Sequence, residues 1–474
     1  MFGKQWIWKD VDITGVSDNS QRIRPGEVFV CRGGSKNDGR AYAEDAVKKG
    51  AAAVVSYMDM ELCVPVLCTE DIQKTAAELS EKFYLPDGKS FGLIGVTGTN
   101  GKTTVTHIIK DILESRGKRV GLIGTNGVFV NGERAKLYTS TPTTPGAVEL
   151  WRIFAAMERV KTDFVVMEVS SHALALGRVL GCEFDVGVFT NLTRDHLDFH
   201  KTMKEYADAK RKLFEISKRA VINIDDMTGR TIYSGFCGEK LSVGADDADI
   251  TWAALSLKEN GSDFLAQYHG KSVPVRLSLP GKFNVYNALS AAGACVLLGI
   301  DFSAAAEGLA FAKPVKGRME KVTGGYGFTV IIDYAHTPDG LEKIIHTAKG
   351  FARGRVITLF GCGGDRDRTK RAVMGGISGK FSDYTVITSD NPRTEEPFCV
   401  IVDIYEGIKD TKGEYCIIPD RKMAIGHALS IAREGDVVLL AGKGQEDYQI
   451  IGNEKIHFDE REIVDEYMKN RRDK

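Results

Sequence analysis

A glycine-rich segment carries the residues best suited to phosphate chemistry. Residues 91–104 read FGLIGVTGTNGKTT, an apolar run followed by a turn and then by KTT at positions 102–104. Gly98 and Gly101 let backbone N–H groups approach an anion closely, while a lysine supplies a mobile positive charge and threonine hydroxyls suit Mg²⁺. The spacing therefore predicts a nucleotide phosphate-binding loop between a buried strand and a helix.

This loop departs from the strict Walker spacing. Val96 stands five residues before Gly101, where the Walker pattern has glycine. The shorter pattern G-x-x-G-K-T remains, with Asn100 before its second glycine. An ordinary strand-to-helix turn is the alternative interpretation, but the combination of Gly, Lys and Thr favours nucleotide binding over it. Nucleotide binding by itself does not identify a reaction.

Two further groups of polar residues follow apolar runs that predict strands. Glu168 lies near the end of the run FVVMEV, just before Ser170. The run VGVFT is followed by NLTRDHLDFH, which contains Asn191, Asp195, His196, Asp198 and His200. Ligands of open parallel sheets bind outside the carboxyl ends of strands, so these groups are expected on one rim with the loop. Glu168 is a candidate metal ligand there, and His196 suits a structural role as well as a chemical one.

Alternating strand and helix patterns predict the framework that would hold these groups. The strand-like runs of the central part lie at 91–96, 120–123, 164–169 and 186–189. Helix-length segments such as 105–115 and 145–157 separate them, and this alternation predicts a parallel, doubly wound sheet. The pattern then restarts, with strands expected at 329–333, 355–360, 384–388 and 436–441.

We therefore expect an α/β protein of three domains. The connector LPDGKS at 85–90 marks one boundary, since Pro, Asp and Gly favour a turn there. The expected parts are a small N-terminal α/β domain at 1–88, a central P-loop ATPase-like domain with a parallel sheet at 89–313, and a C-terminal Rossmann-like α/β domain at 314–474. A length of 474 residues agrees with about three domains of roughly 150 residues each.

Composition argues against several classes of function. The formal net charge is -1, from 63 basic and 64 acidic residues, so no bulk cationic field favours nucleic acid. The start, MFGKQWIWKD, contains no apolar core typical of a signal peptide, and no apolar run approaches the ~18 residues of a membrane span. Nine scattered cysteines without CxxC pairs indicate neither a disulfide framework nor zinc. We expect a cytoplasmic monomer that acts on small molecules, without a nucleic-acid partner.

A series of strings along the chain resembles the motifs of a known enzyme family. The strings, which run from 96 to 449, are VTGTNGKTT, TTPGA, MEVSSHALALGRV, FTNLTRDHLDFH, YADAK, PGKFNVYNALSA, KGRME, DYAHTPD, GCGGDRDRTKR, SDNPRTEEP and AGKGQEDYQ. A weaker match, DNSQRIRPGEVFV, extends into the N-terminal domain. In this order the strings resemble the motifs of the Mur ligase family and, within it, of the MurE type.

This resemblance implies an ATP-dependent amide ligase that uses Mg²⁺. Such a ligase would join meso-diaminopimelate to the D-Glu carboxylate of UDP-MurNAc-L-Ala-D-Glu during cytoplasmic peptidoglycan synthesis. A carboxylate has no good leaving group, so ATP would first convert it to an acyl phosphate, which the amine would then capture. Catalysis would consist mainly of positioning and charge neutralisation.

The resemblance also implies roles for residues on the ATP side. It implies that Lys102, His196 and Lys210 act in catalysis, with Lys210 carbamylated. By composition alone, Lys210 in KEYADAKRKLF would be a solvated lysine on a helix. The implied metal ligands are Thr103, Glu168, His196 and the Lys210 carbamate. The implied ATP-binding residues are Gly98, Thr99, Asn100, Gly101, Lys102, Thr103, Thr104, Asn287, Arg318, Asp333 and His336.

The UDP-linked substrate has its own implied contacts, which are Ser20, Thr143, Thr144, Ser170 and Arg178. Two positions depart from the family pattern. Residues 19–21 read Asn-Ser-Gln where many relatives have Asp-Ser-Arg, and Leu176 stands where some relatives have Gln. On local grounds, the two threonines before a proline could simply cap the following helix.

The C-terminal domain is expected to choose the amino acid. The implied residues are Arg366, Asp390, Asn391, Pro392, Arg393, Gly442 and Glu446. Meso-diaminopimelate differs from lysine by a carboxylate, which a guanidinium can bind through paired hydrogen bonds. A lysine-adding ligase of the MurE type stays an alternative, as do a folylpolyglutamate or cyanophycin synthetase and a P-loop ATPase switch. Folylpolyglutamate and cyanophycin synthetases should lack the pairing of SDNPR with GKGQED. A switch would turn over ATP without an amino acid.

Overall fold

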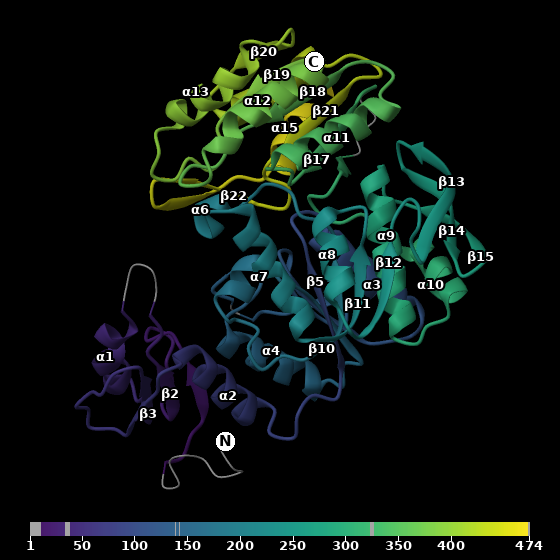
Figure 1. Cartoon of the computed structure of the whole chain (residues 1–474). Helices are drawn as coiled ribbons and strands as arrows, with labels where there is room; N and C mark the ends of the chain where they lie inside the picture. Colours follow the sequence, from purple (N-terminus) through teal and green to yellow (C-terminus); the bar gives the residue numbers. More distant parts are fainter. Residues whose placement is uncertain (1–10, 34–37, 138, 142, 323–326, 473–474) are drawn as a thin grey trace. The chain divides into compact units, whose positions relative to one another are not determined.

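The computed structural model describes residues 11–33, 38–137, 139–141, 143–322 and 327–472. The first ten residues, where the sequence contains no signal-peptide core, lie outside these ranges. The chain forms two compact units, of which the first comprises the part up to residue 95 with 118–185 and 215–217. The second unit comprises 96–117, 186–214 and the part from 218 onward. Strands and helices alternate in both units (Figure 1), so the predicted α/β class is confirmed.

The first unit begins with a small parallel sheet of strand order β1-β2-β3-β4. Its elements are β1 Gly15–Ser17, β2 Glu27–Val30, η1 Gly39–Tyr42, α1 Ala43–Lys48, β3 Ala53–Ser56, β4 Val66–Cys68 and α2 Ile72–Tyr84. Successive side chains of a strand point to opposite faces. Val28 and Val30 therefore pack in one cluster with α2, whereas Phe29 packs in another with α1.

A second set of strands in this unit has the order β5-β9-β6-β7-β8. Its elements are β5 Gly92–Thr97, β6 Val120–Gly124, β7 Gly127–Val130, β8 Glu133–Arg134, α4 Ala147–Arg159, β9 Phe164–Glu168 and α5 Ser171–Ala175. The strands β6 and β9 are parallel, while β7 and β8 add antiparallel pairs. β5 ends in the second unit, where the phosphate loop begins.

The second unit continues with strands in the order β15-β14-β13-β12-β11-β10, followed by the end of β5. The strands are β10 Phe184–Phe189, β11 Ser217–Asn223, β12 Glu239–Val243, β13 Ile250–Lys258, β14 Gly261–Tyr268 and β15 Lys271–Leu277. The helices are α3 Lys102–Ser115, α6 Leu197–His200, α7 Met203–Glu215, α8 Met227–Gly235, α9 Lys282–Leu297, α10 Phe302–Gly308 and η2 Leu309–Phe311.

The last three strands of this set, β13 to β15, are antiparallel. The sequence predicts a parallel sheet here, so these strands are an addition to it. Only two residues, 259–260, separate β13 from β14, and only 269–270 separate β14 from β15. So short a connection permits an antiparallel hairpin but not a parallel crossover.

The rest of the second unit contains a six-stranded sheet of order β16-β17-β21-β18-β19-β20. The strands, with the hairpin β22–β23, are β16 Glu320–Val322, β17 Thr329–Asp333, β18 Val356–Phe360, β19 Tyr384–Ile387, β20 Glu414–Ile417, β21 Val437–Ala441, β22 Tyr448–Ile451 and β23 Glu454–His457. The helices are α11 Pro338–Phe351, α12 Thr369–Phe381, α13 Pro397–Ile408, α14 Arg421–Ile431 and α15 Glu460–Arg472.

Helices cover both faces of this sheet, as the sequence predicts for a doubly wound fold. Ile331 and Leu439 pack with α11, α12 and α13, whereas Ile332 and Leu440 pack with α14 and α15. All strand pairs except β16–β17 are parallel. Asp333 pairs in register with Ala441 and Phe360 with Ile387, so the carboxyl ends of four strands lie at one edge. Loops at such an edge form ligand sites in open α/β sheets.

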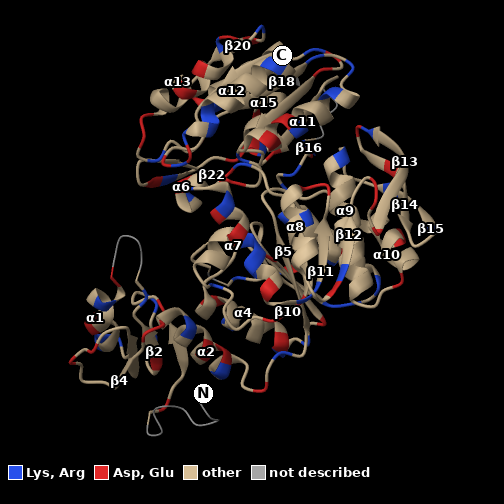
Figure 2. Cartoon of the chain, in the orientation of Figure 1, with Lys and Arg blue, Asp and Glu red and all other residues tan. Residues whose placement is uncertain are grey.

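Charged side chains of both signs are interspersed within each unit (Figure 2). Helices in the described ranges are too short or too polar to span a lipid bilayer.

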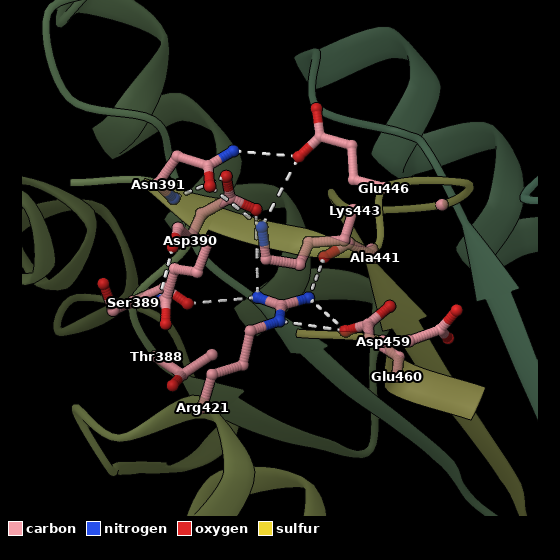
Figure 3. Close-up of polar contacts among 12 residues, drawn as sticks. Thr388, Ser389, Asp390, Asn391, Arg421, Ala441, Lys443, Glu446, Asp459 and Glu460 are labelled. Atoms are coloured by element: carbon pink, nitrogen blue, oxygen red, sulfur yellow. Dashed lines mark hydrogen bonds and ion pairs between the residues drawn. The ribbon is translucent and has the colours of Figure 1, made fainter. Parts of the chain in front are cut away.

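A buried ion pair joins three segments of the six-stranded sheet. Arg421, the first residue of α14, donates to Glu460 Oε1 at 2.9 Å and to the carbonyl of Ala441 at 2.8 Å. Its Nη1 also donates to the carbonyl of Ser389 at 3.3 Å (Figure 3). Both charged side chains are fully buried, so removal of either partner would leave an uncompensated charge in the interior.

The substitution Arg421→Met should therefore destabilise the protein strongly. We expect urea unfolding to show a loss of about 3–5 kcal/mol in the free energy of unfolding, because Glu460 is left buried and unpaired. Lys422→Met is the matched control, since Lys422 is exposed and pairs with exposed Glu466; it should change the free energy of unfolding by less than about 1 kcal/mol. Equal losses in the two variants would contradict this account.

Candidate functional site

The phosphate loop connects β5 to α3, and two of its glycines are required by space. Gly98 has φ +148° and Gly101 has φ +90°. A Cβ at Gly98 would lie 1.9 Å from Thr190 Oγ1, and one at Gly101 would lie 2.5 Å from Asn287 Oδ1. The loop predicted from the sequence thus forms, and Asn287 lies against it as the resemblance implies. Its backbone leads directly into the start of a helix, where N–H groups favour an anion.

Two lysines converge on one carbonyl of this loop. Lys102 Nζ donates to the carbonyl oxygens of Gly98 and Thr99, both at 2.9 Å. Lys210 Nζ, from α7, donates to the same Gly98 oxygen at 2.8 Å. The ammonium of Lys210 also lies 4.5 Å from the ring centroid of Tyr206. Lys210 is almost wholly buried, so it is not the solvated helix lysine that composition alone indicates.

The environment of Lys210 disfavours its charged form. Burial lowers the pKa of Lys210 well below its ordinary value, and the nearby positive charge of Lys102 lowers it further, while Asp195 opposes the shift. Both effects favour the neutral amine of Lys210 over its ammonium form. Neutral amines are nucleophilic, and reaction with CO₂ uses this form of a lysine.

The end of β10 contributes polar groups that hold the loop. Thr190 Oγ1 donates to the carbonyl of Asn100 at 2.6 Å, and Asn191 Nδ2 donates to the same oxygen at 3.1 Å. Asn100 also donates through Nδ2 to Asp339 at 2.9 Å. The predicted meeting of these strand ends is confirmed for Asn191. Thr190 and Asp339 were not singled out as site residues, because their partners are remote in sequence.

A buried carboxylate, Asp195, lies close to two histidines and a lysine beside the loop. His196 Nε2 lies 3.3 Å and His336 Nε2 lies 3.7 Å from Asp195 Oδ2, and Lys370 Nζ lies 3.5 Å from Oδ1. Burial would raise the pKa of Asp195, but the hydrogen bond from His336 and the charge of Lys370 outweigh it and lower this pKa well below its usual value. His196 and His336 are therefore brought together as two predicted site residues. Lys370 is missed by the sequence, since GGDRDRTKR resembles a run of surface charges.

Arg318 reaches the phosphate loop from the segment before β16. Its Nη2 donates to Thr103 Oγ1 at 2.9 Å, and its guanidinium carbon lies 4.7 Å from the Tyr334 ring centroid. Asp333 holds this segment, because its carboxylate accepts from the backbone N–H groups of Met319 at 2.6 Å and Ala335 at 2.7 Å. Burial raises the pKa of Asp333 despite the opposing charge of Arg318.

Glu168 lies in the first unit, at the end of β9. Its Oε1 accepts from the backbone N–H of Thr125 at 2.8 Å and its Oε2 from the Thr125 hydroxyl at 3.1 Å. Thr125 Oγ1 lies 3.1 Å from Thr143 Oγ1, so one predicted substrate contact lies within the same cluster. The side chain is buried, so the hydrogen bonds from Thr125 hold the Glu168 carboxyl group at the end of this strand.

The other residues implied for the UDP-linked substrate lie close by in the first unit. Thr144 Oγ1 accepts from the backbone N–H of Ser170 at 3.0 Å, and Arg178 Nη1 donates to the carbonyl of Thr144 at 3.2 Å. Burial lowers the pKa of Arg178, and the charge of Arg32 adds to this effect. Ser20 is buried in a separate turn, where its carbonyl accepts from Lys49 Nζ at 3.1 Å.

Residues that could bind a metal are distributed over both units. Thr103, His196 and Lys210 belong to the second unit and Glu168 to the first. The described residues contain no group of three or more His, Cys, Asp or Glu side chains arranged as a metal site. Mg²⁺ typically uses one or two carboxylates together with substrate phosphates, so a buried carboxylate and a lysine able to become a carbamate suit this ion.

Two predicted arginines lie together at the edge of the six-stranded sheet. A Cβ at Gly363 would lie 2.8 Å from Arg393 Nη1 and 3.7 Å from Arg366 Cγ. Burial lowers the pKa of Arg393, and the like charge of Arg366 adds to the shift. Arg393 Nη1 donates to the carbonyl of Gly364 at 2.7 Å, and Pro392 lies so close to Gly364 that a Cβ there would meet its carbonyl at 1.8 Å. Arg366 is exposed, and its Nη1 donates to the carbonyl of Asp365 at 2.9 Å. The joint use of the two guanidinium groups on one ligand stays a prediction.

The remaining predicted residues of this edge lie beside Arg393. Asn391 Nδ2 donates to Glu446 Oε2 at 2.9 Å, which joins the end of β19 to the segment after β21. Gly442 has φ +111°, and a Cβ there would lie 2.9 Å from Asp390 Oδ2. That buried oxygen lacks a hydrogen-bond partner among the described residues. Carboxylates and guanidinium groups at one edge form a surface suited to an amino acid that carries both charges.

Known families match this chain along its length. A model described as "Mur ligase family, catalytic domain" matches residues 12–82, "Mur ligase middle domain" matches 96–295, and "Mur ligase, glutamate ligase domain" matches 317–444. A Clostridium botulinum protein named UDP-N-acetylmuramoyl-L-alanyl-D-glutamate--2,6-diaminopimelate ligase is 44% identical over 466 residues, or 97% of this chain and 95% of that protein.

Solved structures give the same assignment. A structure of a ligase with that same name has a TM-score of 0.68 and 32% identity, and the match covers 97% of this chain and 95% of the other. The MurF ligase of Thermotoga maritima, solved in complex with ADP, shares the fold with a TM-score of 0.69 at 19% identity over 98% of this chain and 99% of the other. The chain therefore belongs to the Mur ligase family and, within it, to the MurE type.

Proposed function

We propose that the chain is an ATP-dependent ligase that adds meso-diaminopimelate to the D-Glu carboxylate of UDP-MurNAc-L-Ala-D-Glu. One observation carries this proposal: the second unit holds a phosphate-binding loop and also, at an edge of its six-stranded sheet, the side chains of Arg366 and Arg393 near Gly363 and the carboxylate of Glu446 on Asn391. A phosphate-loop ATPase switch has no need of the second feature. The relative that is 44% identical carries the name of this ligase.

The reaction would proceed by two displacements. An oxygen of the D-Glu carboxylate attacks the γ-phosphorus of ATP, and ADP leaves, which gives an acyl phosphate. The neutral amine of meso-diaminopimelate then attacks the acyl carbon, and phosphate leaves after the amine has lost its proton. Lys102 lies on the loop where the phosphates would bind, so its charge offsets the charge that moves during the first displacement.

The loop and its neighbours would hold the nucleotide. The backbone N–H groups of residues 98–104 and the guanidinium of Arg318, which donates to Thr103, would face the phosphates. Asn287 and His336 would bind the rest of the nucleotide. Mg²⁺ would be held by Thr103, Glu168, His196 and the Lys210 carbamate, and when bound it would neutralise negative charge between phosphoryl and acyl oxygens.

The carbamate is supported by the surroundings of Lys210. A neutral lysine nitrogen attacks the carbon of CO₂ and loses a proton, which leaves an anionic carbamate. The positive charge of Lys102 disfavours a second cation at this place but favours an anion. Lys210 would thereby change from a poorly solvated base into a ligand for a cation.

The arginine pair would select the amino acid. The carboxylate that distinguishes meso-diaminopimelate from lysine can accept paired hydrogen bonds from a guanidinium. Arg393 and Arg366 would bind that carboxylate, whereas Asp390, Asn391, Gly442 and Glu446 would bind the nearby ammonium. Thr143, Thr144, Ser170, Arg178 and Ser20 would bind the UDP-linked substrate. Domains at 1–88, 89–313 and 314–474, a monomeric state and a cytoplasmic location belong to the same proposal.

Phosphate release tests the reaction itself. Purified protein with ATP, Mg²⁺ and UDP-MurNAc-L-Ala-D-Glu should release phosphate rapidly with meso-diaminopimelate and slowly with L-lysine or with no amino acid. Mass spectrometry of the nucleotide product should show the tripeptide only in the first reaction. Equal release in all three reactions would exclude a ligase, and faster release with L-lysine would exclude the proposed specificity.

Loss of the carbamate should abolish most activity. Lys210→Ala is expected to lower kcat by about 10²–10³-fold or more, because a preorganised charge at the reacting groups is removed. Short-chain carboxylates such as acetate should restore part of the rate, since they can supply the missing anion. Lys212→Ala, at an exposed position of the same helix, should retain the wild-type rate. A Lys210→Ala enzyme with full activity would refute the role of this residue.

Removal of one guanidinium should affect the amino acid alone. Arg393→Ala is expected to raise the KM for meso-diaminopimelate by roughly 10- to 100-fold, which corresponds to one or two hydrogen bonds to a charged group. Because L-lysine lacks the second carboxylate, its weak turnover should change much less. The same loss with both amino acids, or higher KM values for ATP, would show that the substitution disturbs the fold instead.

A further inference from the structure

Lys443 is a fully buried lysine between two predicted site residues. It follows β21 directly after Gly442 and precedes Glu446 by three positions. The motif AGKGQEDYQ contributes Gly442 and Glu446 to the predicted amino-acid site, but Lys443 has no predicted role. A fully buried lysine is uncommon and needs partners for its charge.

The ammonium of Lys443 donates hydrogen bonds to three acceptors at the edge of the six-stranded sheet that carries the predicted amino-acid site. It donates to Tyr448 O at 2.8 Å, to Asn391 Oδ1 at 3.0 Å and to Glu446 Oε2 at 3.5 Å. These contacts come from three separate segments, which follow β19, follow β21 and begin β22. Figure 3 shows the Lys443 side chain between Arg421 and the pair Asn391 and Glu446, with contacts drawn to both members of this pair.

These contacts fix the orientation of the Asn391 amide. Asn391 Oδ1 accepts from Lys443 and also from the backbone N–H of Ile450 at 2.9 Å. Both neighbours are donors, so the amide oxygen must face them and Nδ2 must face outward. Nδ2 then donates to Glu446 Oε2 at 2.9 Å. Without the Lys443 ammonium, only the hydrogen bond from Ile450 N–H would oppose a reversed orientation of the Asn391 amide.

Lys443 also supplies positive charge near the buried carboxylate of Asp390. Burial raises the pKa of Asp390, but the charges of Lys443 and Arg421 outweigh it and keep this pKa below its ordinary value. Arg421 is already engaged by Glu460 at 2.8 Å, and its distance to Asp390 Oδ2 is 4.0 Å. Lys443 contacts both Asn391 and Glu446 directly, at 3.0 and 3.5 Å.

We propose that Lys443 is a positioning residue of the amino-acid site, whose buried ammonium holds the Asn391 amide and one Glu446 oxygen in the orientation that receives the substrate ammonium. The inference rests on the proposed function, and it adds a residue behind those that would touch the amino acid. One oxygen of Glu446 is held by Lys443 and Asn391. The other oxygen would thereby be aimed at the ligand. The ligand group is a primary ammonium beside a carboxylate.

A kinetic comparison of the three substrates tests this role. Lys443→Met removes both the charge and the donors, and Lys443→Gln keeps donors without charge. Lys443→Met is expected to raise the KM for meso-diaminopimelate by roughly 10- to 100-fold, and Lys443→Gln by less, since a charge-assisted contact is lost in both. KM values for ATP and UDP-MurNAc-L-Ala-D-Glu should stay within about twofold. Lys422→Met, an exposed lysine of α14, is the control and should match the wild type.

The outcomes separate positioning from a purely structural role. An unchanged KM for meso-diaminopimelate, or an equal rise for all three substrates, would overturn the proposal. If both Lys443 variants fail to fold while Lys422→Met folds, Lys443 is required for the sheet rather than for the site, and the proposal is likewise overturned. Circular dichroism and thermal unfolding of each variant identify that case.

The wild-type reaction distinguishes this inference from the proposed function. If the wild type uses L-lysine, the proposed specificity fails, while the KM comparison is made with L-lysine and decides the role of Lys443 by the same criteria. If the wild type uses no amino acid, both proposals fail. Selective loss of amino-acid affinity in Lys443→Met, with the other two substrates unaffected, supports the positioning role.

Discussion

The carbonyl oxygen of Gly98 accepts hydrogen bonds from the side-chain nitrogens of two lysines, and the chemistry of the loop depends on this shared acceptor. Lys102 and Lys210 approach it at 2.9 and 2.8 Å from different helices. Two cations so close in a buried place cannot both retain ordinary pKa values, and the more buried one, Lys210, loses its proton more easily. Gly98 itself must be glycine, because Thr190 occupies the space of a Cβ. The carbonyl that both lysines contact therefore belongs to a residue that cannot carry a side chain.

Strand ends explain why residues distant in sequence meet. In the six-stranded sheet, the register of β17 with β21 and of β18 with β19 aligns four carboxyl ends at one edge. The segments that follow carry Asp390, Arg393 and Glu446, and Gly442 leaves room for Asp390. The same edge is stabilised from below by Arg421, which ties the ends of β19 and β21 to the start of α15. The carbonyls that Arg421 contacts, those of Ser389 and Ala441, therefore belong to the segments that carry the site residues.

Much of this arrangement could be predicted from local sequence. Strands with continuous apolar runs, such as 329–333, are found where the pattern places them, because both of their faces are buried by helices. The phosphate loop could likewise be predicted locally, from its glycines and from the residues that begin the following helix. The hairpins of β13 to β15 are not part of the predicted parallel sheet, although Asn260 and Gly261 form a sequence typical of a hairpin turn. Lys370, Lys443 and Asp339 were missed for another reason: each looks like surface charge until a partner remote in sequence is known.

Two buried ionic contacts of the second unit differ in the free-energy cost of separating their partners. Arg421 and Glu460 link elements of a single sheet, so separating them exposes neither to water without unfolding that sheet. Asp195 instead joins the segment after β10 to His336 and Lys370, which precede α11 and lie in α12. Water that entered a gap there would hydrate the carboxylate and compensate for the lost partners. Separation of Arg421 from Glu460 therefore costs much free energy, whereas separation of Asp195 from its partners costs less once water hydrates the carboxylate.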